Sequence, residues 1–243
     1  MEKQKVEFRD LGRMDYKSAW DYQDELMKKN LKIKAGAGSW QLTVGNKEVK
    51  DELPTVNYLL FVEHPPVYTM GKSGKMEHVL INEEQRKAKG IEFYQTNRGG
   101  DITFHGPGQA VGYPILDLEK FYTDIGRYLR ELEEVIILTL AEYGITAGRS
   151  KGETGVWIDA EVKGKERKIC AMGVRCSRWI TMHGFAFNIN TDLPYFNYII
   201  PCGIQDKKVT SLKEELGREV SMEEVKQKLK RNFEKVFNVE LRG

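Results

Sequence analysis

The segment from Arg98 to Leu118 constrains the fold of this chain more than any other. Its 21 residues include five glycines and two prolines, yet strand-forming residues lie between them. Glycine lets the backbone turn tightly or approach a ligand closely, and Ile102–Phe104 and Ala110–Leu116 have the composition of short strands. Arg98 and His105 stand on either side of the first of these strands. Polar groups that short strands carry beside glycine turns are typical of a pocket, although two ordinary turns would give the same local pattern.

The composition indicates one domain, residues 1–243, of a cytoplasmic protein. A chain of 243 residues with 40% hydrophobic content can bury one substantial core. The 38 basic and 36 acidic residues nearly cancel, which argues against a dedicated nucleic-acid-binding protein. No apolar run approaches the ~20 residues that cross a bilayer, and the first residues lack the apolar stretch of a signal peptide. The three cysteines have no CxxC spacing, which favours free thiols in a reducing compartment.

The first quarter of the chain predicts a helix, a surface insertion and a buried strand. Asp15 can cap a helix that runs to about Asn30 with apolar side chains along one side. Residues 31–53 lose this periodicity and gain glycines and lysines, so we expect a surface insertion with a hairpin around Gly45–Asn46. Thr55–Val62 is a continuous apolar run of strand length, which predicts a buried strand.

The remaining elements alternate less regularly. A helical pattern runs from about Thr123 to Tyr143, and a capping box at Ser221–Glu224 starts the last helix. Between these helices, strands are expected over residues 155–162, 168–174 and 179–190. The last of these strands should be interrupted at His183–Gly184. Strands dominate the middle and helices the flanks, without a βαβ alternation, which predicts an α+β fold with a mixed or antiparallel sheet flanked by helices.

Cys202 is the strongest candidate for a nucleophile. It lies between Pro201, which has a fixed φ and no N–H, and Gly203, which can adopt unusual φ, so its thiol should be presented at a sharp corner. A free thiol with a pKa near ~8.5 is mostly protonated at neutral pH, so a nucleophile needs a cationic or basic neighbour. The competing interpretation is a small buried hydrophobe. It fits Cys170, in an apolar strand, and Cys176, in a polar turn, better.

The residue that would activate Cys202 stays open on the residue pattern alone. His105 and His183 each lie beside a glycine and could form a Cys–His pair. Lys168 opens the apolar strand Lys168–Gly173, where partial burial would lower the pKa of its amine and let it act as a base. The alternative for Lys168 is an ordinary lysine without a catalytic role.

Three other kinds of site are disfavoured. The three cysteines and His183 lack the short paired spacing of structural zinc sites. Gly71-Lys72-Ser73 imitates the end of a phosphate-binding loop, but Pro66 stands where the first glycine of that loop belongs. The chain has no G-x-S-x-G sequence, which disfavours a serine hydrolase.

Several motifs resemble those of the lipoyl(octanoyl) transferases. Residues 98–115 match the family pattern R-G-G-x-x-T-[YF]-H-G-P-G-Q-x-[VL]-x-Y-P-I almost without a gap. Further matches follow in the family's order at Phe61–Gly71, Gly155–Ile158, Lys168–Arg175, His183–Asn188, Ile200–Ile204 and Val209–Leu212. The resemblance covers about residues 55–240. Residues 31–53 look like an insertion, and Phe104 stands where tyrosine is common.

The resemblance implies a fold like that of the biotin/lipoate protein ligases and assigns roles to residues. Cys202 would carry the acyl group as a thioester, and Lys168 would lower the pKa of its thiol. Three segments would line the acyl-binding channel: Arg98, Gly99, Gly100, Asp101, Ile102, Thr103, Phe104 and His105; Ala171, Met172 and Gly173; and Gly184, Phe185 and Ala186.

The implied reaction moves an octanoyl or lipoyl group from acyl carrier protein to a lysine of a lipoyl domain, the first step of lipoate synthesis. The acceptors would be the lipoyl domains of 2-oxoacid dehydrogenases and the glycine cleavage H protein. Amide formation from a thioester is downhill, so neither a nucleotide nor another cofactor nor a metal is expected, and no nucleic-acid or membrane partner. Two alternatives remain: an ATP-dependent lipoate or octanoate–protein ligase, which the thiol of Cys202 disfavours, and a non-catalytic module that docks acyl carrier protein.

Overall fold

A mixed sheet of nine strands forms the body of the protein in the computed structural model, which describes residues 3–36, 40–44, 47–51, 54–200 and 208–243. The strand order is β14–β1–β4–β8–β12–β11–β10–β9, and β13 pairs with β11. The strands are β1 (Gln4–Arg13), β4 (Asn57–Glu63), β8 (Gln109–Ile115), β9 (Ala147–Gly148), β10 (Val156–Ile158), β11 (Arg167–Ser177), β12 (Ile180–Asn188), β13 (Lys208–Val209) and β14 (Val239–Arg242). Strand β1 is parallel to β14 and β4, β13 is parallel to β11, and the other pairs are antiparallel, so the predicted mixed sheet is confirmed.

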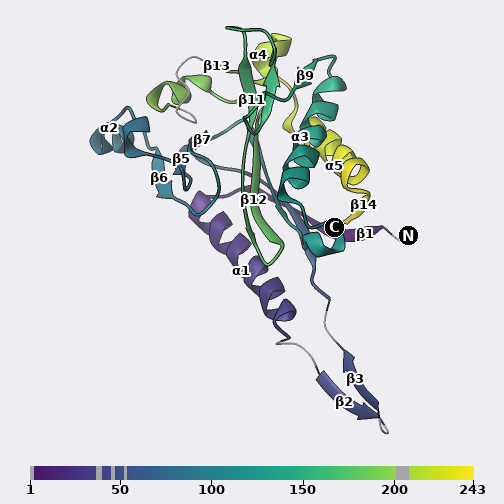
Figure 1. Ribbon diagram of the computed structural model, residues 1–243. Coiled ribbons are helices and arrows are strands. Elements are labelled where there is room, and N and C mark those ends of the chain that lie inside the picture. Colours follow the sequence, from purple (N-terminus) through teal and green to yellow (C-terminus); the bar gives the residue numbers. More distant parts are fainter. Residues whose placement is uncertain (1–2, 37–39, 45–46, 52–53, 201–207) are drawn as a thin grey trace.

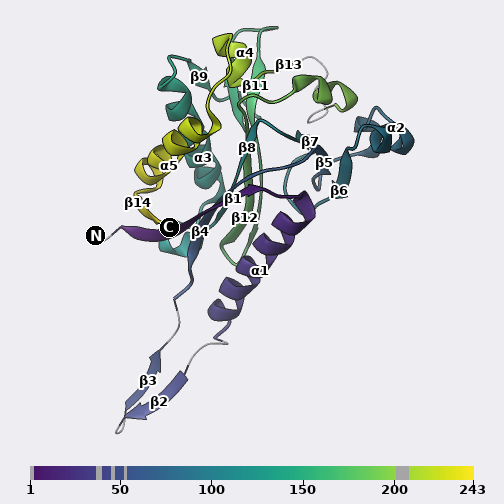
Figure 2. The same ribbon diagram turned by 180° about the vertical axis from the view of Figure 1, so that it is seen from behind.

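Helices cover both faces of this sheet (Figures 1 and 2). Helix α1 (Tyr16–Lys34) packs on one face, and α3 (Ile125–Ala141) and α5 (Met222–Phe237) pack together on the other. In β4, Leu59 and Phe61 face α3 and α5, whereas Leu60 and Val62 face α1. Because both faces are buried, this strand reads as a continuous apolar run and not as an alternating one. Among the described helices, none combines the length and apolar character that spanning a bilayer requires.

A second, three-stranded sheet lies beside the main one and carries the segment that opens with Arg98. Its strands are β5 (Val67–Met70), β6 (Glu92–Gln95) and β7 (Ile102–His105), in the order β6–β5–β7. Short helical segments complete this region and the chain: η1 (Met76–His78), α2 (Glu83–Ala88), η2 (Leu118–Lys120), η3 (Leu193–Tyr198) and α4 (Leu212–Leu216). Tyr68, Ile102, Phe104, Phe196 and Ile199 form a small core here. This core fixes β7 close to the main sheet.

Within residues 31–53 the predicted hairpin is confirmed. Strands β2 (Trp40–Val44) and β3 (Lys47–Asp51) pair antiparallel to each other and project away from the main sheet (Figure 1). The expected turn at Gly45–Asn46 lies outside the described residues.

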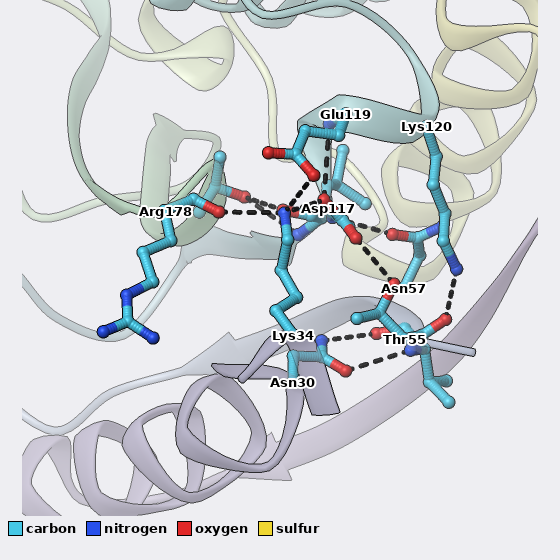
Figure 3. Close-up of polar contacts among 11 residues, drawn as sticks. Asn30, Lys34, Thr55, Asn57, Asp117, Glu119, Lys120 and Arg178 are labelled. Atoms are coloured by element: carbon cyan, nitrogen blue, oxygen red, sulfur yellow. Dashed lines mark hydrogen bonds and ion pairs between the residues drawn. The ribbon is translucent and has the colours of Figure 1, made fainter. Parts of the chain in front are cut away.

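The two ends of this insertion are bonded to one buried carboxylate (Figure 3). Asp117, which follows β8, accepts hydrogen bonds from Lys34 Nζ at 2.8 Å and from Thr55 Oγ1 at 2.7 Å. Lys34 ends α1, and Thr55 lies just before β4. Next to this pair, the Asn30 side chain bonds the backbone N–H and carbonyl of Val56. The insertion is therefore anchored to the body at both of its ends.

Four expectations of the sequence analysis were wrong. The strand expected over residues 155–162 ends at Ile158, where β10 ends. Helix α1 continues to Lys34 instead of ending near Asn30, so the first residues of the expected insertion are helical. Strand β12 runs through His183–Gly184 without interruption, although His183 adopts φ of 60°. Cys176 lies in β11 opposite Thr181 and not in a turn.

Strands β1 and β14 were not predicted. Strand β14 is the edge strand, and β1 lies between β14 and β4. Strand β1 alternates charged residues with Val6 and Phe8. Helix α1 connects β1 to the parallel strand β4, and α2 connects β5 to the parallel strand β6. The fold therefore contains two βαβ connections that the sequence analysis did not expect.

Candidate active site

A cavity of about 510 Å³ lies between the small sheet and strands β8, β12 and β11 of the main sheet. Most of the predicted contact residues line it, from three segments of the chain. They are Arg98, Gly99, Gly100, Asp101, Ile102, Thr103, His105, Ala171, Met172, Gly173, Gly184, Phe185 and Ala186. Lys168 lines the same cavity. Residues more than 80 positions apart are therefore brought to one site.

Glycines allow these segments to approach one another. Gly173 and Gly184 are opposite each other on β11 and β12. The N–H of Gly99 donates to the carbonyl of Val174 at 2.9 Å. A Cβ on Gly173 would lie 2.7 Å from the Gly99 carbonyl oxygen, and a Cβ on Gly184 would lie 2.2 Å from that of Gly112. Larger residues at these two positions would push the strands and the loop apart.

Phe104 does not line the cavity. Its buried ring stacks on Tyr195 with centroids 4.7 Å apart and meets the edge of Phe196. Because side chains alternate along a strand, Thr103 and His105 face the cavity while Phe104 packs against η3. The predicted contact segment 98–105 is thus interrupted by one structural residue.

A chain of hydrogen bonds fixes the proton of His105. The side-chain nitrogen of Gln109 donates to Asn188 Oδ1 at 2.8 Å and to the backbone carbonyl of residue 104. Its Oε1 is therefore the acceptor 2.8 Å from His105 Nδ1, which carries the proton. His105 Nε2 then accepts from the Thr69 hydroxyl at 3.2 Å, and that hydroxyl accepts from Arg98 Nη2 at 3.0 Å.

The histidines around the cavity are neutral at pH 7. Desolvation lowers the pKa of His105 well below 6.5, and the neighbouring His64 adds to this effect. Burial also lowers the pKa of His64 to about 4. In His183, burial and then the charge of Arg98 lower the pKa to about 3. An uncharged imidazole cannot stabilise a thiolate as a cation would.

Lys168 is a buried cation at the edge of the same cavity. Its side chain is 8% exposed, and its Nζ lies 4.6 Å from the centre of the Trp157 ring. Strand β11 holds its backbone between Trp157 of β10 and Val209 of β13. The carbonyl of Lys168 accepts from the N–H of Thr210 at 3.0 Å. Attraction between the ammonium and the aromatic face stabilises this partly desolvated charge.

The three cysteines have different places. Cys202 falls within residues 201–207, outside the described part of the chain, so the predicted Cys202–Lys168 pair is not observed. Cys170 is fully buried, and desolvation raises the pKa of its thiol. Burial also raises the pKa of Cys176, which is half-buried. Both thiols are protonated at neutral pH, which agrees with a structural role. Over the ranges that the structure describes, no group of three His, Cys, Asp or Glu side chains could hold a metal ion.

Several lining residues were missed by the sequence analysis. They include Tyr16, Gln109, Val111, Tyr113, Leu129, Asn188 and the loop 152–154. Gln109 and Asn188 lie inside motifs that were recognised, so these motifs gave a usable signal for both polar side chains. Tyr16 and Leu129 come from amphipathic helices, where a cavity-facing residue has the same pattern as a core residue.

Comparison with known proteins identifies the family to which the chain belongs. The chain belongs to the family of the lipoyl protein ligase A/B catalytic domain, whose family model matches residues 15–234. It is 57% identical over 238 residues to a protein of Christiangramia forsetii named octanoyltransferase, covering 98% of this chain and 97% of that protein. A protein of Flavobacterium johnsoniae with the same name is 58% identical, covering 98% of each chain.

Solved structures of the same fold are more distant in sequence. A chain from the structure of the bi-partite lipoate protein ligase and its E2 lipoyl domain from Thermoplasma acidophilum has a TM-score of 0.68 at 17% identity, covering 98% of this chain and 86% of that one. Lipoate-protein ligase A bound with ATP has a TM-score of 0.64 at 16% identity, covering 100% and 88%. These similarities show that the chain has the lipoate-protein-ligase fold.

Proposed function

We infer that this protein is an octanoyltransferase that acts in protein lipoylation. The observation that carries this function is the near-complete match to relatives of that name, with 57% and 58% identity over almost the full length of each chain. The cavity agrees with it, because small residues form much of its wall and leave room for an aliphatic chain. We further propose that residues 1–243 form one catalytic domain, that 31–53 is a surface insertion, and that the protein acts in the cytoplasm.

The proposed reaction has two steps on Cys202. In the first, the thiolate attacks the thioester carbonyl of the donor, a new carbon–sulfur bond forms, and the donor thiol leaves with a proton. In the second, a lysine amine of the acceptor attacks the acyl-cysteine, an amide forms, and the Cys202 thiolate is released. Each step moves protons near one sulfur, which calls for a nearby acid and base.

Lys168 is proposed to hold and move these protons. Two observations support this role. Lys168 lines the cavity, and β13, which pairs with β11 at Lys168, is the first element after residues 201–207. The neutral histidines cannot supply a positive charge. Arg98 also lines the cavity, but its guanidinium bonds the carbonyls of Thr69 and Gly99, so Lys168 is proposed as the cation that acts on Cys202. The acyl chain is proposed to contact the lining residues of segments 98–105, 171–173 and 184–186. Phe104 is proposed to act only indirectly, by packing on Tyr195 and Phe196 of η3.

The proposed partners are two protein classes. The acyl donor is octanoyl-acyl carrier protein, and the acceptors are lipoyl domains, including those of 2-oxoacid dehydrogenases and the glycine cleavage H protein. A thioester already carries the free energy that amide formation needs. Transfer from it therefore requires no nucleotide.

The test of this function compares two acyl sources. Purified protein is incubated with a lipoyl domain in two mixtures. The first contains octanoyl-acyl carrier protein and a chelator, and the second contains free octanoate, ATP and Mg²⁺. Mass spectrometry then measures the mass of the lipoyl domain. Octanoylation of the lipoyl domain is expected in the first mixture. Product in the second mixture alone would identify a ligase, and acyl carrier protein binding without product in either would identify a docking module.

A further inference from the structure

Glu133 of α3 is a buried carboxylate that the reaction described above does not use. Its side chain is 0% exposed, yet three donors reach it. Oε2 accepts from Arg130 Nη1 at 2.8 Å and from Arg149 Nε at 3.0 Å, and Oε1 accepts from the N–H of Gly155 at 2.9 Å. A buried carboxylate persists when such donors replace its lost water.

These contacts hold both ends of one loop. Arg149 follows β9 and Gly155 precedes β10, and the loop between them lines the cavity with Gly152, Glu153 and Thr154. Arg149 is fixed further by bonds from Nη2 to the carbonyl of residue 130 and to the carboxylate of residue 134. One carboxylate therefore fixes this part of the cavity wall to α3.

The hydrogen bond between Glu133 and Gly155 is connected to Lys168 through two packing contacts. Gly155 has φ of 120°, and a Cβ there would lie 2.6 Å from the carbonyl oxygen of Cys170, so its backbone packs directly on β11. Two residues later, Trp157 lies opposite Lys168 and places its ring under the ammonium.

We propose that Glu133 is a positioning residue, which holds loop 149–155 and strand β10 so that the Trp157 ring sets the place of the Lys168 amine. This proposal rests on the proposed role of Lys168 in acyl transfer. A shift of about 1 Å in a reacting group can cost ~10²-fold in rate, so a residue that fixes such a group affects kcat without touching substrate.

The first arm of the test measures transfer by Glu133→Gln, with Glu134→Gln as the matched control. Glutamine keeps the size but turns an N–H₂ group toward two arginines, so the loop loses one of its attachments. The neighbouring Glu134 is partly exposed and bonds only Nη2 of Arg149 among the bonds described, so its replacement leaves both ends of the loop attached to Glu133. Glu133→Gln should lower kcat by ~10-fold or more with the KM for the acyl donor changed less than ~3-fold, and Glu134→Gln should stay within ~2-fold of wild type.

The second arm measures the amine itself. Trace acetylation with peptide mapping compares Lys168 with Lys120, whose Nζ donates to the carbonyl of Thr55 far from the loop. In Glu133→Gln, the acetylation rate of Lys168 should change at least ~3-fold relative to Lys120. An unchanged ratio, or equal activity losses in the two glutamine variants, would overturn the proposal.

Two further points keep the outcome decisive. If Glu133→Gln does not fold, Arg149→Gln takes its place, because the Arg149 side chain is 36% exposed and Gly155 keeps its acceptor. Its Lys168 acetylation ratio should also differ from wild type, and an unchanged ratio counts against the proposal. The acetylation arm needs no turnover, so absence of octanoyl transfer in the wild type would refute the proposed function without deciding the role of Glu133.

Discussion

Lys168 supplies a cation to a cavity whose histidines carry no charge at pH 7. Burial keeps His105 and His183 neutral, and the hydrogen bond from His105 Nδ1 to Gln109 fixes its tautomer. These neutral imidazoles therefore form part of the cavity wall and its hydrogen bonds. The ammonium over Trp157, in contrast, can lower the pKa of a nearby thiol and exchange a proton. Charge and proton transfer are separable by substitution.

Two variants of Lys168 separate these roles. Lys168→Met loses both the charge and the proton, whereas Lys168→Arg keeps the charge but does not release its proton, since the guanidinium pKa exceeds ~12. We expect the rate of octanoyl transfer to fall by at least ~10²-fold in both variants, because general acid–base catalysis is typically worth that much. Steady-state kinetics with octanoyl-acyl carrier protein measures this. An arginine variant within a fewfold of wild type would show that charge alone suffices.

The sequence predicted most lining residues that lie inside the recognised motifs, and few of the others. Gly173 and Gly184 could be named because they lie in motifs that resemble those of the family. The structure gives the physical reason for glycine there, which is the close approach of neighbouring backbones. Phe104 was predicted as a lining residue because the motif gives no sign of which side chains alternate outward. Tyr16 was not predicted to line the cavity, since contact with a cavity and contact with a core select the same apolar helix face.

At the scale of elements, the clamp at Asp117 joins the end of α1 to the start of β4. Lys34 pairs with Asp117 at 2.8 Å and with Glu119 at 2.8 Å, and the side chain of Lys34 is only 14% exposed. Thr55 donates to the other oxygen of the same carboxylate. An insertion between these residues can extend from the body without loosening the sheet, because both of its ends are held.

Asp117→Asn tests this clamp. The amide loses the charge that faces Lys34, although Glu119 remains as a partner, so the free energy of unfolding should fall by about 2 kcal/mol. The matched control is Asp21→Asn, which breaks an exposed pair with Lys17 and should change the free energy of unfolding by less than about 0.5 kcal/mol. Urea denaturation of the two variants measures both values. Equal effects would show that the clamp adds nothing to stability.

Element types followed from the sequence more reliably than element ends. The periodicity of α3 and α5 and the apolar run of β4 predicted their type because burial sets the pattern directly. Strands β1 and β14 were not predicted, because few of their side chains are buried and the two strands that pair lie far apart in the sequence. The end of α1 was missed because its last residues, Lys32 to Lys34, depend on the clamp and not on an apolar face.

For the molecule as a whole, the buried imidazoles make stability depend on pH. In the unfolded chain a histidine binds a proton as the pH falls through about 6.5, whereas folded His64 and His183 do so only near pH 4 and pH 3. Acid therefore favours the unfolded state. The stability that these neutral side chains supply is present above pH 6.5 and is lost progressively as the pH falls below it.

Each of these two histidines should lower the free energy of unfolding by about 2 kcal/mol between pH 7 and pH 5. His64→Gln removes one titrating group. Between pH 7 and pH 5, the free energy of unfolding of this variant should therefore fall by about 2 kcal/mol less than that of the wild type, whatever the stability of the variant at pH 7. Urea denaturation at both pH values gives the comparison. An equal loss in the variant would mean that His64 binds its proton in the folded state.

The most direct measurement of the central claim maps the acyl group on the protein. The protein is mixed with octanoyl-acyl carrier protein in the absence of acceptor, digested, and analysed by peptide mass spectrometry, beside a Cys202→Ala variant. We expect the octanoyl mass on the peptide that contains Cys202, its loss on addition of a lipoyl domain, and no transfer by the variant. An adduct on Cys170 or Cys176, or full turnover by Cys202→Ala, would contradict the account.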